Sequence, residues 1–197
     1  MKLFDFNKVV VLENNRVKLS PLLGDHYSHL LPIALNNIGL LKYSPTLIDT
    51  EEKYKAYFET ALSVKTNHVR YPFIIFDKLK NKYAGSTSFG NISNKDQRLE
   101  IGWTWIGRDF QGTGLNKNCK FLLLKYAFEE LGFMRVELKT DARNQQSRRA
   151  IEKIGAKYEG LLRSHTLMSD GFRRDTVYYS ILKNEWPQVK RNIFNME

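Results

Sequence analysis

A glycine-bearing turn between an expected strand and an expected helix constrains this chain more than any other stretch. Residues 99–106 are rich in β-branched and aromatic side chains, as strands are. After the turn at residues 111–117, apolar residues recur at helical spacing until Gly132, which is placed to end the helix. A tight turn that opens a helix leaves several backbone N–H groups unpaired, at the positive end of the helix dipole. The turn is therefore suited to bind an anion, most often a phosphate.

The composition is that of one folded domain. With 197 residues, of which 42% are hydrophobic and 26% charged, the chain is long enough to bury a core. Its one cysteine, Cys119, cannot form an internal disulfide, so we expect an intracellular, cytoplasmic protein. No apolar run approaches the roughly 20 residues that cross a bilayer, and the first residues do not resemble a signal peptide. We expect no membrane partner.

The net charge of +10 has two interpretations. It attracts a polyanion, such as RNA on a ribosomal surface, or it only keeps the protein soluble. The basic residues are spread along the chain, and no nucleic-acid-binding motif accompanies them. We therefore do not expect direct binding of nucleic acid.

The order of the expected elements predicts the fold class. Turn residues between the β-rich runs favour antiparallel pairing, and a loop-helix connection follows the third strand of the central sheet. The class is α/β (α+β), with a mixed, mostly antiparallel sheet flanked by helices, and we expect the two early helices to cover a sheet edge or wall a substrate pocket. The strands are expected at residues 9–12, 16–19, 71–76, 83–91, 99–106, 135–140, 157–163 and 172–182, and the helices at 24–35, 50–62, 115–131 and 144–154.

The turn itself carries a recognisable pattern. It lacks the Gly-Lys-Ser/Thr of a Walker A loop, and Lys117 stands where a dinucleotide fingerprint has its third glycine. Gln111, Gly114 and Asn116 instead stand at the positions of Gln/Arg-x-x-Gly-x-Gly/Ala. Here the chain resembles the GNAT superfamily of N-acetyltransferases, although Asn116 departs from the family's small residue and adds bulk beside the turn.

Further stretches extend the resemblance over residues 11–187, and the whole chain, 1–197, is expected to be a single GNAT domain. Residues 141–147 and 150–156 resemble the family's Asn-x-x-Ser helix and its hydrophobic-Gly ending. Residues 100–103, 170–175 and 179–186 resemble the RimJ/RimL-like branch. That branch acetylates the N-terminal amines of ribosomal proteins, and its relatives use other amines.

The resemblance implies acetyl-CoA as co-substrate and no metal. It places the pyrophosphate on the turn and the pantetheine arm beside the strand, where backbone groups do the binding. We expect the side chains of Trp103 and Trp105 to be ordinary core. The implied cofactor-binding residues are Trp103, Thr104, Trp105, Ile106, Gln111, Gly112, Thr113, Gly114, Leu115, Asn116, Lys117 and Asn144.

Two residues are candidates for catalysis. Ser147 is placed to protonate the departing thiolate, although an Asn144 cap followed by Ser147 also suits any helix start. Glu100 is the candidate base, and the alternative is a surface carboxylate. For Lys117 and Lys120 there are two interpretations. They contact the phosphates of the coenzyme, or they are solvated lysines on an exposed helix face. His26, His29 and Asp25 have a loosely ligand-like spacing without a third ligand element, so we expect no metal there.

The function that these features imply is direct transfer of acetyl from acetyl-CoA to a primary amine in a ternary complex. The favoured acceptor is the α-amine of a protein N-terminus, of the ribosomal-protein kind. Two alternatives stay open: acetylation of a small-molecule amine, and a non-catalytic GNAT-fold module that binds acyl-CoA or RNA. The sequence is compatible with a monomer or a homodimer.

Overall fold

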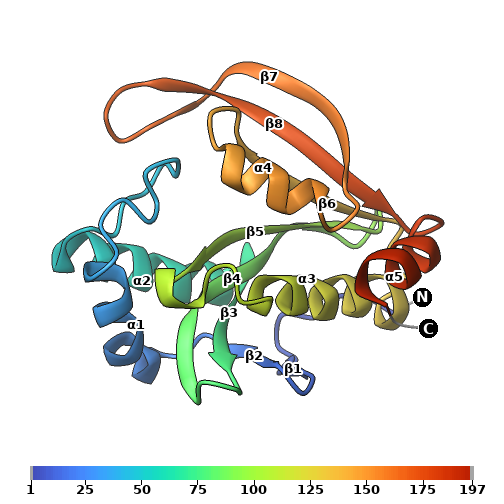
Figure 1. The fold of residues 1–197 in the computed structure, drawn as a ribbon, viewed down its shortest axis with the longest axis horizontal. Coiled ribbons are helices and arrows are strands. Elements are labelled where there is room, and N and C mark those ends of the chain that lie inside the picture. The colour runs from blue at the N-terminus through green and yellow to red at the C-terminus, as the bar shows by residue number, and fades with distance from the viewer. Residues whose placement is uncertain (1, 196–197) are drawn as a thin grey trace.

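The protein is built on one eight-stranded sheet with the strand order β1-β2-β3-β4-β5-β6-β8-β7 (Figure 1). A computed structural model describes residues 2–195. The strands are β1 (Leu12–Glu13), β2 (Val17–Pro21), β3 (Arg70–Asp77), β4 (Lys82–Ser93), β5 (Arg98–Ile106), β6 (Arg135–Asp141), β7 (Lys157–Leu167) and β8 (Arg173–Leu182). The helices are α1 (Tyr27–Leu35), α2 (Glu51–Thr66), α3 (Leu115–Lys125), α4 (Gln145–Glu152) and α5 (Trp186–Phe194).

The two faces of the sheet carry separate cores. On one face, α3 and α4 pack through Leu123 and Ile151 against strand residues that include Leu99. On the other face, α1 and α2 pack through residues such as Phe58 against Ile74 of β3. Because β3 is covered on both faces, nearly all of its residues are buried, which explains its continuous apolar run.

The fold class predicted from the sequence is confirmed, because the sheet is mixed, mostly antiparallel and flanked by helices. One expectation about packing is wrong: α1 and α2 cover the face formed by β3 and β4 and not a sheet edge. Two elements were missed, the C-terminal helix α5 and a π-helical turn at Tyr126–Glu130 that extends α3. No helix within residues 2–195 combines the length and the apolarity needed to cross a membrane.

The strands β5 and β6 run parallel, and they separate soon after they meet. Beyond their last pair, β6 continues beside β8, and β5 continues beside β4. Over residues 101–106, β5 therefore has an edge with no strand on it within the described chain. The paired residues are Arg98 with Arg135, Leu99 with Val136 and Glu100 with Glu137.

A β-bulge lies in the open stretch of β5. Ser86 of β4 pairs with Trp105 and Ser88 pairs with Gly102, so one β4 residue faces two residues of β5. Trp103 takes up the extra length with a positive φ of 50°, an uncommon value for a bulky side chain. The bulge also shifts the alternation of the strand: Ile101 belongs to the α3 core, whereas Trp105 belongs to the α2 core.

Close contact between β4 and β5 at Gly85 gives a testable prediction. A Cβ atom at Gly85 would lie 2.0 Å from the carbonyl oxygen of Trp105, which is backbone and cannot move aside. We expect Gly85→Ala to lower the free energy of unfolding by about 3 kcal/mol or more, measured by urea denaturation. The matched control is Gly160→Ala, where a Cβ meets nothing within 4 Å; this change should stay within about 1 kcal/mol. Equal stability of the two variants would contradict the steric argument.

Candidate functional site

The glycine turn before α3 has the predicted geometry. Gly112 and Gly114 have φ values of 71° and 82°, in the left-handed region that glycine adopts without strain. A Cβ atom at either glycine would meet nothing within 4 Å, so the surface of the turn is open. Leu115, fully buried, anchors the start of α3 in the core. The N–H groups of the first turn of α3 are thus presented at an open surface, where the helix dipole favours an anion.

Side-chain hydrogen bonds fix the turn to its surroundings. Gln111 donates through Nε2 to the carbonyl oxygen of Ile106, at 2.8 Å, which ties the turn to the end of β5. Thr113 donates through Oγ1 to the carbonyl oxygen of Phe110, at 2.7 Å, and accepts from Arg16, at 3.3 Å. The turn is therefore preorganised by its own side chains.

The N-terminus of α4 lies beside this turn. Asn144 caps α4, because its Oδ1 accepts from the backbone N–H of Ser147 at 3.0 Å. Gln146 donates through Nε2 to Oε1 of Gln111 at 3.1 Å, which links the two helix starts. The structure shows the capping role of Asn144; a cofactor contact stays a prediction. The positive ends of two helices meet next to the open edge of β5.

The residues after the turn differ in exposure. Lys117 is exposed and lies over the ring of Phe194, with Nζ 5.8 Å from the ring centroid. Asn116 is half-buried, and its Oδ1 has no hydrogen-bond partner within the described residues. Because the space above both glycines is empty, the side chain of Asn116 does not crowd them.

The two tryptophans of β5 have different environments. Trp105 is buried and donates through Nε1 to the hydroxyl of Tyr57, at 3.0 Å, so its side chain is core as expected. The same expectation is wrong for Trp103, which is 39% exposed. Its ring lies against Gly90 and under the guanidinium of Arg70, 4.8 Å from the ring centroid. The positive φ at the bulge turns this side chain out of the core.

Glu100 lies at the last residue pair before β5 and β6 separate. Its neighbours Leu99 and Ile101 point into the α3 core, so the carboxylate points to the opposite face of the sheet. There Oε2 accepts from Asn91 Nδ2 at 2.6 Å and pairs with Lys139 Nζ at 2.9 Å. The residue is 3% exposed, so the alternative of a surface carboxylate is wrong.

Ser147 is half-buried at the start of α4. Its backbone N–H is used by the Asn144 cap, and no hydrogen bond of its hydroxyl is found within residues 2–195. The hydroxyl is thus available to a ligand, and its role as an acid stays a prediction.

Sequence reasoning missed the burial of Lys120. This residue is 6% exposed, and its Nζ donates to Oγ1 of Thr104 on β5 at 2.7 Å. Burial lowers the pKa of its ammonium to about 8. Lys120 is therefore neither a solvated lysine nor a group at the mouth of the turn. A signal existed, because Lys120 precedes the buried Leu123 and Leu124 by one helical turn.

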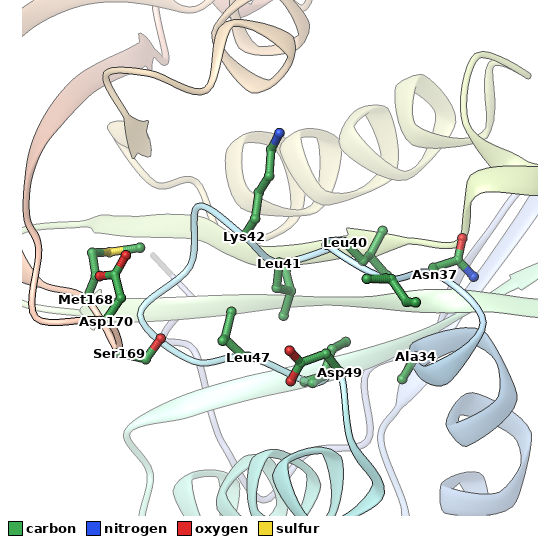
Figure 2. A pocket seen from close by; sticks show the side chains of 13 residues that line it. Ala34, Asn37, Leu40, Leu41, Lys42, Leu47, Asp49, Met168, Ser169 and Asp170 are labelled. Atoms are coloured by element: carbon green, nitrogen blue, oxygen red, sulfur yellow. The ribbon is translucent and has the colours of Figure 1, made fainter.

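The structure contains a cavity of about 250 Å³ (Figure 2). It lies between the segment that links α1 to α2 and the tip of the β7–β8 hairpin. Figure 2 shows an aliphatic lining from the linking segment, with the carboxylate of Asp49 and the hydroxyl of Ser169 among it. Such a lining suits an apolar body that carries a polar group.

The histidines near the N-terminus have structural contacts. His26 accepts through Nδ1 from the backbone N–H of Leu23 at 3.0 Å, at the start of the first helical turn. His29 lies against Tyr83, with 4.7 Å between ring centroids. Within residues 2–195, no three His, Cys, Asp or Glu side chains are grouped to hold a metal ion.

Known proteins share this sequence and this fold. Residues 16–157 match the family described as "Acetyltransferase (GNAT) domain". The Bacillus subtilis protein YdaF, provisionally named a ribosomal N-acetyltransferase, is 39% identical over 106 residues, which are 54% of this chain and 57% of YdaF. The chain spans between 55% and 63% of the lengths of the three Bacillus proteins it matches.

Two solved structures extend the similarity over nearly the whole chain. An acetyltransferase-like structure from T. thermophilus is 33% identical, with a TM-score of 0.85 over 99% of this chain and 98% of that chain. A GCN5-related N-acetyltransferase from Brucella melitensis has a TM-score of 0.88 over 99% of this chain and 88% of that chain; at 24% identity it supports the fold alone.

The buried ammonium of Lys120 predicts a pH-dependent stability. The folded state holds this proton less tightly than the unfolded state, with a pKa of about 8 against 10.5. Unfolding therefore takes up a proton between these pH values, and wild-type stability should rise, relative to Lys120→Met, as the pH rises from 8 to 10.5. At pH 7 the variant should be more stable by up to about 3 kcal/mol.

Urea denaturation of both proteins at pH 7 and pH 10 measures this difference. Other titrating groups are common to both proteins and cancel in the comparison. A wild-type protein that is as stable as Lys120→Met at pH 7 would contradict the burial of a charged ammonium.

Proposed function

Because the chain belongs to the GNAT acetyltransferase family, we propose that it transfers the acetyl group of acetyl-CoA to a primary amine. One observation carries this proposal: the open edge of β5, at residues 101–106, leads to a turn where two helix N-termini meet. An extended arm with peptide-like amides can pair with a strand edge, and a diphosphate can bind helix-start N–H groups.

The residues fit the coenzyme in their chemistry. The N–H groups of residues 112–117 would hold the diphosphate, and Lys117 adds a positive charge at the open surface. Backbone groups of residues 103–106 would pair with the arm, helped by the bulge at Trp103, which leaves one residue out of the β4 ladder. RimJ from Mycobacterium smegmatis, which shares the fold with a TM-score of 0.78 at 21% identity, was solved in complex with CoA-disulfide.

Two side chains are proposed to move protons. When bound, acetyl-CoA supplies an acetyl group already activated as a thioester. Glu100 lies at the point where the strands separate, on the face away from α3, and would accept the proton of the acceptor amine. Ser147 would donate a proton to the thiolate from the start of α4. The other residues of the site would hold the amine and the thioester in line, and such alignment supplies much of the rate enhancement in transfers of this kind.

The favoured acceptor is the α-amine of a protein N-terminus. Its pKa of about 7.7–8.0 leaves roughly a tenth of it free at pH 7, whereas a lysine with a pKa near 10.4 is almost fully protonated. An α-amine thus needs little help from Glu100, which already pairs with Lys139. The provisional name of YdaF, a ribosomal N-acetyltransferase, supports an acceptor of ribosomal origin. The aliphatic cavity of about 250 Å³ has room for one side chain of a peptide.

Release of free thiol from acetyl-CoA tests this function. Incubation with short peptides that have a free N-terminus should release thiol faster than incubation with the same peptides blocked by formylation. Small amines at equal concentration should react more slowly, because they leave the aliphatic cavity empty. Faster reaction of small amines would show that a small amine, and not a peptide, is the preferred acceptor. Coenzyme binding without any thiol release would indicate a non-catalytic module. RNA binding that weakens steeply with salt, without coenzyme binding, would indicate the RNA-binding alternative.

Replacement of Glu100 by glutamine tests the proposed base. Glutamine keeps the size of the side chain but cannot accept the proton, so turnover of an N-terminal peptide at pH 7 should fall about tenfold, since roughly a tenth of the α-amine is free at that pH without a base. The control is Glu137→Gln on the paired strand position, whose carboxylate is held by Arg135 at 2.9 Å and should not affect turnover. The logarithm of the rate should also be plotted against pH for both proteins. A slope near one up to about pH 8 that is the same in wild type and Glu100→Gln would remove Glu100 from the mechanism.

A further inference from the structure

Lys120 carries a buried ammonium whose hydrogen-bond capacity is not filled by the protein. An ammonium has three N–H donors. Among residues 2–195, its Nζ has one acceptor, Thr104 Oγ1 at 2.7 Å, and no carboxylate oxygen within 4.0 Å. Thr104 Oγ1 is itself 2.8 Å from Thr87 Oγ1. Because a buried ammonium with free donors is costly, such a group indicates a missing acceptor.

The position of Nζ along β5 indicates which part of a ligand it would meet. Ile106 lies next to the turn, because its carbonyl oxygen accepts a hydrogen bond from Gln111. Thr104 lies two residues away from Ile106, which is about 7 Å along a strand. Nζ is held at Thr104, so it lies beside β5 two residues before the end of the strand at Ile106.

The surroundings of Nζ contain an open strand edge. Thr104 belongs to the stretch of β5 that has no partner strand on the β6 side within the described chain. Lys120 reaches this stretch from α3, so it lies on the face of β5 opposite to Glu100. Any extended ligand that pairs with the edge of β5 would pass beside this ammonium.

We propose that Lys120 Nζ donates a hydrogen bond to an amide carbonyl of the pantetheine arm of CoA. This assignment rests on the proposed function and adds a side-chain contact to it. Pantetheine carries two amide groups, and each carbonyl is an acceptor that an ammonium can satisfy. Thr104 holds Nζ in place for this contact, and the free donors of Lys120 become paired when the arm binds.

Calorimetric titration with two ligands tests the assignment. One ligand is CoA, and the other is 3′-phospho-ADP, which keeps both phosphates of the diphosphate but lacks the arm. For Lys120→Met, the Kd of CoA should rise about 10- to 100-fold, whereas the Kd of 3′-phospho-ADP should stay within about twofold of wild type. The control is Lys125→Met, an exposed lysine of the same helix, which should leave both Kd values unchanged.

Lys120→Gln is a second variant for the same titrations. Its shorter side chain keeps N–H donors, so it should bind CoA more tightly than Lys120→Met, and it tests the contact if the methionine variant does not fold. An unchanged Kd for CoA in the folded variants would overturn the assignment. Equal weakening of both ligands would also overturn it, in favour of a phosphate contact. A wild-type protein that binds neither ligand would overturn the proposed function together with the assignment.

Discussion

The early separation of β5 from β6 is the constraint on which the rest of this structure depends. Backbone N–H and C=O groups inside a protein need partners, so a strand edge opened in the middle of a sheet is costly unless something pairs with it. Here the opening starts after Glu100, and the bulge at Trp103 follows at once. The starts of α3 and α4 then lie beside it, linked through Gln111 and Gln146. The open edge and the turn thus adjoin each other at Ile106, whose carbonyl oxygen accepts from Gln111.

Burial divides the charged groups between the two faces of β5. On the face away from α3, the buried carboxylate of Glu100 has partners of its own, Asn91 and Lys139. On the α3 face, the described residues give Lys120 a hydroxyl and no acid. The strand therefore separates the buried carboxylate of Glu100 from the buried amine of Lys120. That separation suits a reaction in which two substrates approach from opposite sides.

Local features of the sequence predicted more of the site than its long-range features did. The turn at residues 111–117 was predictable because glycine positions and helical spacing act within a few residues, and the Asn144 cap was predictable for the same reason. The exposure of Trp103 was not, since it follows from the register between β4 and β5, which no local pattern encodes. The burial of Lys120 likewise depends on Thr104, a partner on another element. Helix α5 was missed because the sequence motifs were followed only as far as residue 187, just after this helix begins at Trp186.

The shortness of the β5–β6 ladder has a mechanical consequence. Two halves of the sheet, β1–β5 and β6–β8, share a seam of three paired residues at one end. The two halves are also joined by the core on the α3 face, which contains Phe89 of one half and Tyr179 of the other. Rotation of one half against the other would break these contacts, so the spacing of the two halves is set by the core and not by the short ladder.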